Sequence, residues 1–422
     1  MPPSSVTGRR PGEELPRPHP TPSGSGGPGR RAPLSDLMVV SLEHAIAAPL
    51  ASRYLADMGA RVIKIERPGV GDMARGYDTA VKGMSSHFVW TNRSKESAAL
   101  DLRSAQGKAI LDQLLGRADI FITNLSQGAV EKLGLDGAEL TQHHKRLIVC
   151  RITGFSPKSG LSSLKAYDLL IQAESGLLSI TGTPDEMAKV GIPVADIAAG
   201  TFALIGILSR IHTRDQTGRG GIVRVSLWDS LIEWMGYPIL YTKYGGNPPE
   251  RTGPRHATIS PYGPIRLLDG IVFIAVQNAP EWGQFCKTVL QRPELAEDPR
   301  FHNNTARVRN RDRLETEIQK VTAGLTVKEV EERLVLADIA HGRCRSIDDL
   351  LDHPTLLSDD RWVEVDSPVG TIETLAPPLD FGALSGAPKI PALGEDTSNV
   401  LRWIGYSDQE IQAFQASGIV GT

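Results

Sequence analysis

The sequence predicts an α/β protein with a doubly wound parallel sheet in a large domain and a smaller α+β domain. From Leu37 onward, short apolar runs alternate with amphipathic helical stretches and short connections, which is typical of a parallel sheet covered by helices. After about residue 230 the alternation becomes irregular, and a loop rich in proline and glycine precedes a further strand and helices. A chain of 422 residues also favours two domains over one core.

The elements of the large domain follow one another in a regular order. Strands are predicted for the short apolar runs "LMVVSL", "RVIKIE", "DIFITN" and "RLIVCRI". Helices are predicted for the intervening stretches "PLASRYLADMG", "SAQGKAILDQLLG" and "AVEKLG". Two longer helices are expected at residues 166–180 and 195–212, with a polar loop between them.

The large domain is predicted to begin at residue 35 and to extend to residue 229, followed by a small domain at 230–367. The small domain contains a strand at "DGIVFIAV" and helices at 311–320 and 326–337. Residues 1–34 contain nine prolines and six glycines, so a disordered tail is predicted there. The closing segment "SNVLRWIGYSDQEIQAFQASGIV" is helical, but its periodicity does not show where it docks.

Composition excludes several functional classes. The net charge of −3 is too small to recruit nucleic acid or an anionic membrane, so neither partner is expected. The longest apolar run, "IAAGTFALIGIL", is too short to span a bilayer. The three cysteines are far apart and have no metal-ligand spacing, which favours reduced thiols and a cytoplasmic location. A mitochondrial location stays open if the source is eukaryotic.

The usual catalytic signatures are missing from the sequence. The first strand-to-helix turn, "LEHAIAAP", lacks the glycines of a dinucleotide site, and Glu66 at the end of the second strand fits a ribose ligand or a solvated acid equally well. There is no Walker loop, G-x-S-x-G, H-E-x-x-H or C-x-x-C. Hydride transfer, phosphoryl transfer, zinc chemistry and serine hydrolysis therefore lose support, and neither a metal nor a bound cofactor is expected.

Carboxylates remain as candidates for chemistry. The stretch "LLSITGTPDEMAKVGIPVADI" carries Asp185, Glu186 and Asp196. Taken alone, "TPDE" is ordinary turn chemistry, and a solvated or capping role for Asp185 is the favoured interpretation. The functional alternative is a carboxylate that forms a covalent acyl intermediate.

Seven blocks, in consistent order over residues 36–422, resemble the family III CoA-transferases, the formyl-CoA and carnitine CoA-transferase group. They are "YLADMGARVIKIERPGVGDMAR", "TNRSKESAALDLR", "ADIFITNLSQGAVEKLGL", "ITGF", "QAESGLLSITG", "TRDQTGRGGIVRVSLWDS" and "PALGEDTSNVLRWIGYSDQEI". The resemblance implies an enzyme that moves CoA between carboxylic acids, with an acyl-CoA and a free acid as partners and CoA as a substrate. In that reading Asp185 attacks the thioester, and an aspartyl-CoA thioester carries the CoA to the incoming acid.

The resemblance also implies CoA contacts. By their place in the family motifs, the CoA-binding residues would be Ala45 and Ile46 near the pantetheine, Arg67, Arg103 and Lys132 at the phosphates, and Leu100, Asn124 and Leu125 along the adenine and ribose. Two positions depart from the family: Leu125 stands where an aromatic is common, and Thr153 replaces a lysine of some members. Stacking on the base and one phosphate contact are therefore in doubt.

The sequence leaves two alternatives: an acyl-CoA racemase or epimerase of the same superfamily, and a non-catalytic CoA-binding protein. The racemases of this superfamily use a His-Asp pair and a further Asp, whereas this chain has Tyr167 before Asp168, so CoA transfer is preferred. Asp196 is then expected to cap the helix that follows it. Arg251, Arg255 and His256 could meet the second carboxylate of a dicarboxylic acid such as succinate.

The resemblance finally implies an interlaced homodimer, in which each chain threads through its partner. It also implies that residues 368–422 complete the large domain.

Overall fold

The computed structural model describes residues 32–358, 360–379 and 388–421, so the tail predicted for residues 1–34 lies almost entirely outside the described residues. The chain forms two compact units. Of the described residues, unit 1 contains those up to Ser163, Ile197–Ser226 and those from Val363 onward. Unit 2 contains Leu164–Asp196 and Leu227–Trp362.

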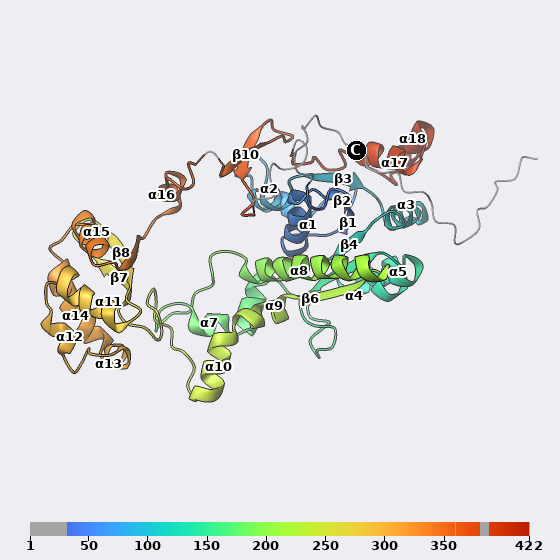
Figure 1. The fold of residues 1–422 in the computed structure, drawn as a ribbon. Helices are drawn as coiled ribbons and strands as arrows, with labels where there is room; N and C mark the ends of the chain where they lie inside the picture. Colours follow the sequence, from blue (N-terminus) through green and yellow to red (C-terminus); the bar gives the residue numbers. More distant parts are fainter. Residues whose placement is uncertain (1–31, 359, 380–387, 422) are drawn as a thin grey trace, which may run out of the picture. The chain divides into compact units, whose positions relative to one another are not determined.

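Unit 1 is built on a six-stranded sheet in the order β3-β2-β1-β4-β5-β6, in which all neighbours are parallel (Figure 1). Its strands are β1 (Met38–Leu42), β2 (Arg61–Glu66), β3 (Lys95–Ala99), β4 (Ile120–Thr123), β5 (Ile148–Thr153) and β6 (Gly221–Ser226). The predicted parallel sheet and its four inner strands are confirmed. The two edge strands, β3 and β6, were not predicted.

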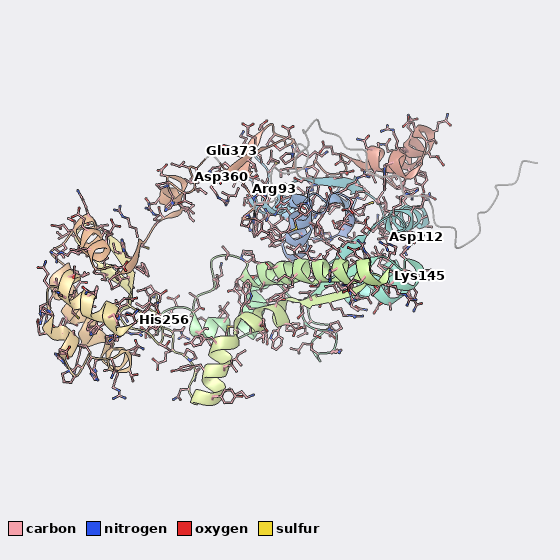
Figure 2. All side chains as sticks on the ribbon, viewed as in Figure 1. Arg93, Asp112, Lys145, His256, Asp360 and Glu373 are labelled. Carbon is pink, nitrogen blue, oxygen red and sulfur yellow. The ribbon has the colours of Figure 1, made fainter. Side chains whose placement is uncertain are left out.

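Helices cover both faces of this sheet. Val39 and Val40 are neighbours in β1, point to opposite faces and are both fully buried, which explains why this strand reads as a continuous apolar run. The helical elements of the first half of unit 1 are α1 (Ala47–Asp57), η1 (Met73–Gly76), α2 (Ser86–Asn92), α3 (Ala105–Leu115), α4 (Gln127–Leu133) and α5 (Gly137–His143). Arg93, labelled in Figure 2, donates at 2.8 and 2.9 Å to the buried Asp57 and so ties the end of α2 to α1.

The C-terminal segment docks on unit 1. Helices α17 (Thr397–Ile404) and α18 (Asp408–Ala416) contribute Val400, Leu401 and Ile411 to the core cluster that also contains α3 and one face of the sheet. A backbone N–H of β3 donates to the Asp396 carboxylate at 2.9 Å, which adds a polar tether. The docking place that periodicity left open is therefore the β3 side of the sheet. A short pair of strands, β10 (Trp362–Val365) and β11 (Ile372–Leu375), precedes this segment.

Helix α8 (Val194–Thr217) is longer than predicted and, among the described residues, is long and apolar enough to cross a bilayer by length and composition alone. A core helix of a soluble protein meets the same two criteria. In unit 1 the glycines of α8 allow close packing: a Cβ on Gly200 would lie 2.7 Å from the carbonyl oxygen of Ala47, and one on Gly206 would lie 2.6 Å from Val223. These contacts identify α8 as a helix packed against α1 and β6.

Unit 2 contains a three-stranded antiparallel sheet with its own apolar core. The predicted strand at "DGIVFIAV" and both predicted helices are confirmed, as β8, α14 and α15. The elements of unit 2 are α6 (Asp168–Glu174), α7 (Leu177–Ile180), α9 (Leu227–Trp234), α10 (Gly236–Gly245), β7 (Tyr262–Arg266), β8 (Ile271–Ala275), α11 (Ala279–Gln284), η2 (Phe285–Val289), α12 (Glu294–Glu297), α13 (Asn304–Arg309), α14 (Arg311–Thr322), α15 (Val327–Leu336), β9 (Ala340–Arg343) and α16 (Ile347–Leu351).

The helix predicted at residues 166–180 is broken into α6 and α7. Gly176 adopts φ +79° between them, a left-handed conformation that glycine takes without steric cost and that ends a helix. The prediction of one continuous helix was therefore wrong, because the glycine inside the apolar pattern is a break.

Candidate active site

The residues predicted to bind CoA gather at one edge of the sheet of unit 1. In a parallel sheet the carboxyl ends of all strands meet at the same edge, and the strand order here reverses direction between β1 and β4. Ligands of doubly wound proteins bind outside this edge, at such a reversal. The eight predicted residues follow β1 (Ala45, Ile46), β2 (Arg67), β3 (Leu100, Arg103) and β4 (Asn124, Leu125, Lys132).

The three predicted phosphate ligands are exposed, but their surroundings differ. Arg103 is 73% exposed and donates two hydrogen bonds, of 2.8 and 2.9 Å, to the carboxylate of Asp101. A phosphate would have to compete with this carboxylate for the guanidinium group. Arg67 lies directly after β2, and Lys132 lies in the last turn of α4.

The predicted adenine and ribose ligands are less available than the sequence suggested. Leu100 is buried, and Leu125 packs partly against the core cluster of the sheet. The amide of Asn124 is engaged with the backbone of His44: its oxygen accepts from the His44 N–H at 2.9 Å and its NH₂ group donates to the His44 carbonyl at 2.8 Å. Asn124 thus holds the turn that contains Ala45 and Ile46.

Beneath this turn lies a buried group of four charges that the sequence analysis missed. The side chains of Glu43, Lys64, Asp72 and Lys95 are all fully buried. Lys95 donates to Glu43 at 2.8 Å, Lys64 donates to Asp72 at 2.7 Å, and Lys64 lies 3.4 Å from Glu43. We call these four residues the buried quartet. The sequence signalled only one member, Lys64, as a lysine inside a predicted strand.

Burial and pairing oppose each other in the quartet. Burial would raise the pKa of Glu43, but Lys95 and Lys64 outweigh it and lower that pKa below its ordinary value. Burial would lower the pKa of Lys64, but Glu43 and Asp72 raise it instead. For Lys95 burial prevails over the attraction of Glu43 and lowers the pKa to about 8. The quartet therefore holds two carboxylates and two amines in a dry environment.

Glu66 is neither a free ribose ligand nor a solvated acid. Its carboxylate accepts from Arg75 at 2.9 and 2.7 Å, from the N–H of Asp72 at 2.9 Å and from Ser97 at 2.7 Å. Burial raises its pKa, but the hydrogen bonds from Arg75 and the charge of Lys64 lower it to about 2. Both interpretations of this residue were wrong, because its partners lie in segments that the strand pattern does not reveal.

Asp185 lies at the exposed tip of a tight turn in unit 2. An isolated bridge pairs Gly182 with Met187, and the N–H of Glu186 donates to the Thr183 hydroxyl at 3.1 Å. Arg251 donates to the carbonyl oxygens of Thr183 and Pro184 at 2.8 and 2.9 Å. The turn is therefore held in place just before Asp185, and its carboxylate faces water.

Asp196 has a different environment in the same unit. It lies in the first turn of α8, which begins at Val194, so the prediction that Asp196 caps this helix was wrong. Asp168 instead accepts from the Ala195 N–H at 2.7 Å and from the buried Gln172 at 2.7 Å. Burial, and secondly the charge of Asp168, raise the pKa of Asp196 to about 7.

Gln172 links this pair of carboxylates to the acidic turn. It is fully buried, and its side-chain oxygen accepts from the Val190 N–H at 3.0 Å while its NH₂ group donates to Asp168. One amide therefore orients Asp168 and fixes the chain between Asp185 and Asp196. A carboxylate with a raised pKa beside a second carboxylate is a frequent property of catalytic groups.

The three residues suggested for a second substrate carboxylate are already engaged within unit 2. Arg251 binds the turn carbonyls, and Arg255 pairs with Glu315 at 2.7 Å. The His256 ring stacks on Tyr262 and accepts from two backbone N–H groups. Arg255 is still 40% exposed and lines a cavity of about 310 Å³ with Arg311 and Tyr262. No group of three or more side chains that could hold a metal ion occurs within the described part of the chain.

Comparison with known proteins decides the family. The family model of CoA-transferase family III matches residues 34–397. The chain belongs to CoA-transferase family III. The acetyl-CoA:oxalate CoA-transferase of Acetobacter aceti is 34% identical over 69% of this chain and 75% of its own. The succinyl-CoA:glutarate CoA-transferase of Mus musculus is 29% identical over 92% of this chain and 90% of its own.

The fold of this transferase is also similar to that of a solved structure. A crystal structure of a CaiB/BaiF family protein from Brucella suis superposes with a TM-score of 0.77 at 30% identity, covering 89% of this chain and all of that one. The predicted family and the predicted enzyme class are therefore confirmed, and the protein is an enzyme that transfers CoA between carboxylic acids. The racemase and non-catalytic alternatives lose their support.

Proposed function

We propose that this CoA-transferase acts on small dicarboxylic acids and passes the acyl group through a covalent anhydride on a carboxylate of unit 2. The acids are suggested by the relatives, which are named for oxalate and for succinate and glutarate. The chemical part is supported by the Asp168–Asp196 pair, in which burial and the charge of Asp168 raise the pKa of Asp196 to about 7.

The proposed reaction needs no cofactor. A carboxylate oxygen attacks the thioester carbonyl and displaces the CoA thiolate, which leaves an anhydride between the enzyme and the donor acid. The thiolate then attacks the enzyme's carbonyl and releases the donor acid, so an aspartyl-CoA thioester forms. The acceptor acid attacks this thioester and displaces the CoA thiolate, so an anhydride forms between the acceptor and the enzyme. The thiolate then attacks the acceptor's carbonyl and releases the enzyme's carboxylate. Each step exchanges one acyl bond for another of similar energy, so CoA moves between acids without ATP.

Two residues are candidates for the attacking carboxylate. Asp185 stays the prediction of the motif comparison, and its side chain is exposed. We favour Asp196 for its chemistry. Its side chain is partly removed from water, and a raised pKa gives the anion a more basic and more nucleophilic oxygen. At pH 7 about half of such a group is ionised, which is sufficient for attack.

The test compares Asp185→Asn with Asp196→Asn. The assay follows CoA exchange from succinyl-CoA to oxalate or glutarate. We expect Asp196→Asn to lose exchange by a factor of about 10³ or more and Asp185→Asn to stay within about tenfold of the wild type. Borohydride reduction in the presence of succinyl-CoA, followed by peptide mass spectrometry, identifies the acylated residue. Acylation of Asp185 would return the assignment to the motif-based prediction, and acylation of neither would refute the covalent route.

CoA binding is assigned to the carboxyl edge of the sheet of unit 1. The predicted residues at the ends of four neighbouring strands support this, together with the exposed cations Arg67 and Lys132. Calorimetry with CoA and with dephospho-CoA separates a residue at the 3′-phosphate from the others. The site would be refuted if all three variants bind CoA as tightly as the wild type: Arg67→Ala, Arg103→Ala and Lys132→Ala.

The interlaced homodimer is also a proposal. Helices α9 and α10 expose Trp234, Tyr237, Leu240 and Tyr244, of which Tyr244 is 77% exposed. Aromatic side chains are enriched at the cores of protein interfaces, and a second copy of the chain would remove these from water. Sedimentation at nanomolar concentration should show only dimers, because interlaced chains cannot separate without unfolding. A folded monomer on dilution would contradict interlacing.

A further inference from the structure

The turn between β1 and α1 has an unusual backbone conformation. Ala45 adopts φ +63°, in the left-handed region that residues with a Cβ rarely occupy. Such a conformation persists only where the surrounding structure holds it. The turn lies at the carboxyl end of β1, where the proposed CoA site is, so what holds it bears on how CoA is bound.

Asp72 holds the turn from one side. The Ala45 N–H donates to one oxygen of the Asp72 carboxylate at 3.0 Å, and the Ala74 N–H donates to the same oxygen at 2.9 Å. The other oxygen accepts from Lys64 at 2.7 Å. Asn124 holds the preceding residue from the other side through its two hydrogen bonds to the His44 backbone. Consecutive peptide groups are thus fixed by side chains of different segments.

The rest of the buried quartet orients Lys64. Its ammonium lies between Asp72 and Glu43, and Glu43 in turn accepts from Lys95 and from Ser52. The four charges cancel, so the quartet offers no net field for an ion. Buried ion pairs contribute little to stability compared with apolar side chains of similar size. A role in fixing one conformation therefore explains the quartet better than a role in stability.

We propose that Asp72 is a positioning residue for CoA: it holds Ala45 in the left-handed conformation that the bound pantetheine requires. This rests on the proposed CoA site and adds a residue that does not itself touch CoA. If the hydrogen bond from Ala45 is removed, the turn relaxes, and only the fraction of molecules with a correctly formed turn binds CoA. The apparent Kd then rises by the inverse of that fraction.

The expected effect is a rise in Kd on the order of tenfold, which is about 1.4 kcal/mol. This is the size of the steric penalty that an L-residue pays in the left-handed region. The turnover number at saturating acyl-CoA should stay within about twofold, because Asp72 takes no part in the chemical steps. If Asp72 only stabilised the fold, its replacement would lower the stability of the protein without raising KM at an unchanged kcat.

Two matched double variants test the proposal in the full chain. Lys64→Met with Asp72→Asn removes the ion pair but keeps an oxygen that accepts from the Ala45 N–H. Lys64→Met with Asp72→Leu removes the ion pair and that oxygen, while the side-chain shape is nearly unchanged. If the leucine chain is insoluble, Asp72→Ala in the same background gives the comparison with less steric risk.

We expect the asparagine variant to bind CoA within about twofold of the wild type and the leucine variant to bind on the order of tenfold more weakly. The leucine variant should also have the lower thermal midpoint, because the N–H groups of Ala45 and Ala74 both lose their acceptor. KM for acyl-CoA should follow the Kd values. Equal CoA affinity in the two variants, or a loss confined to kcat, would overturn the proposal. If Arg67→Ala and Lys132→Ala lower the affinity for CoA but the leucine variant does not, only the positioning role of Asp72 is refuted. If no variant weakens CoA, the proposed site itself is wrong.

Discussion

The substitution Asp196→Asn should increase stability while it removes activity, and the increase should depend on pH. In the folded protein burial and the nearby charge of Asp168 raise the pKa of Asp196 to about 7 from an ordinary value of 3.8. A carboxyl whose pKa is raised on folding stabilises the folded state least when it is ionised. Stability is therefore lost as pH rises from about 4 through about 7. An asparagine carries no charge and avoids this loss.

The magnitude follows from the pKa change. One pKa unit corresponds to about 1.4 kcal/mol, so a shift of about three units makes the ionised wild type about 4 kcal/mol less stable at pH 8. At pH 5 the Asp196 carboxyl is protonated in the folded state but mostly ionised in the unfolded state. Folding therefore requires the uptake of a proton, which costs about 1.6 kcal/mol. Water reaches part of the Asp196 side chain and reduces both values. We expect a gain of ~2–4 kcal/mol at pH 8 and less than half of it at pH 5.

Urea unfolding, followed by tryptophan fluorescence at pH 5 and pH 8, measures this difference. Asp185→Asn is the matched control, because Asp185 is an acid of the same unit whose side chain is exposed. Its stability should stay within about 0.5 kcal/mol of the wild type at both pH values. An equal gain for Asp196→Asn at the two pH values, or a loss at pH 8, would refute the claim that Asp196 is a desolvated carboxylate beside a like charge.

Three further predictions concern other parts of the molecule. Glu43→Gln should destabilise unit 1 by roughly 3–5 kcal/mol in chemical denaturation, since it leaves two buried lysines with one carboxylate. Glu96→Gln, at the partly exposed pair with Arg61, should cost at most about 1 kcal/mol in the same assay. Arg67→Ala should weaken CoA by ~1.5–3 kcal/mol in calorimetry, and an unchanged Kd would contradict a phosphate contact. In D₂O, a 2-methylacyl-CoA should take up deuterium at the α-carbon no faster than the uncatalysed control while CoA moves to an added acid; rapid uptake without CoA exchange would instead indicate racemisation.

Part of the fold follows directly from the sequence. The inner strands β1 and β4 are buried on both faces and read as continuous apolar runs, whereas β2 and β5 each carry one basic residue inside an otherwise apolar stretch; the structure confirms all four. Edge strand β3 was missed for a physical reason: it reads "KESAA", without a large apolar residue, so it lacks the pattern of a buried strand. Edge strand β6 reads "GIVRVS", and its single arginine does not distinguish it from the predicted β5. The family could also be read from the sequence, since seven motif blocks in order identify it without any geometry.

The chemistry of the candidate site could be read from the sequence only in part. The resemblance to the family motifs predicted the residues that bind CoA, and the parallel order of the strands explains why they follow strands at one edge of the sheet. The sequence could not show that Lys95 in a polar strand pairs with Glu43, or that Gln172 joins Asp168 to the chain beyond the acidic turn.

Tertiary structure alone decided which acids are unusual. The sequence treated Glu66 as a strand-end acid and Asp196 as a helix cap, whereas the fold buries the first against Arg75 and brings the second close to Asp168. A local pattern reports how a segment lies relative to the core, so it predicts strands and helices. The pKa of a carboxyl depends on the water removed from it and on charges that other segments bring within a few ångströms, and those distances exist only once the chain has folded.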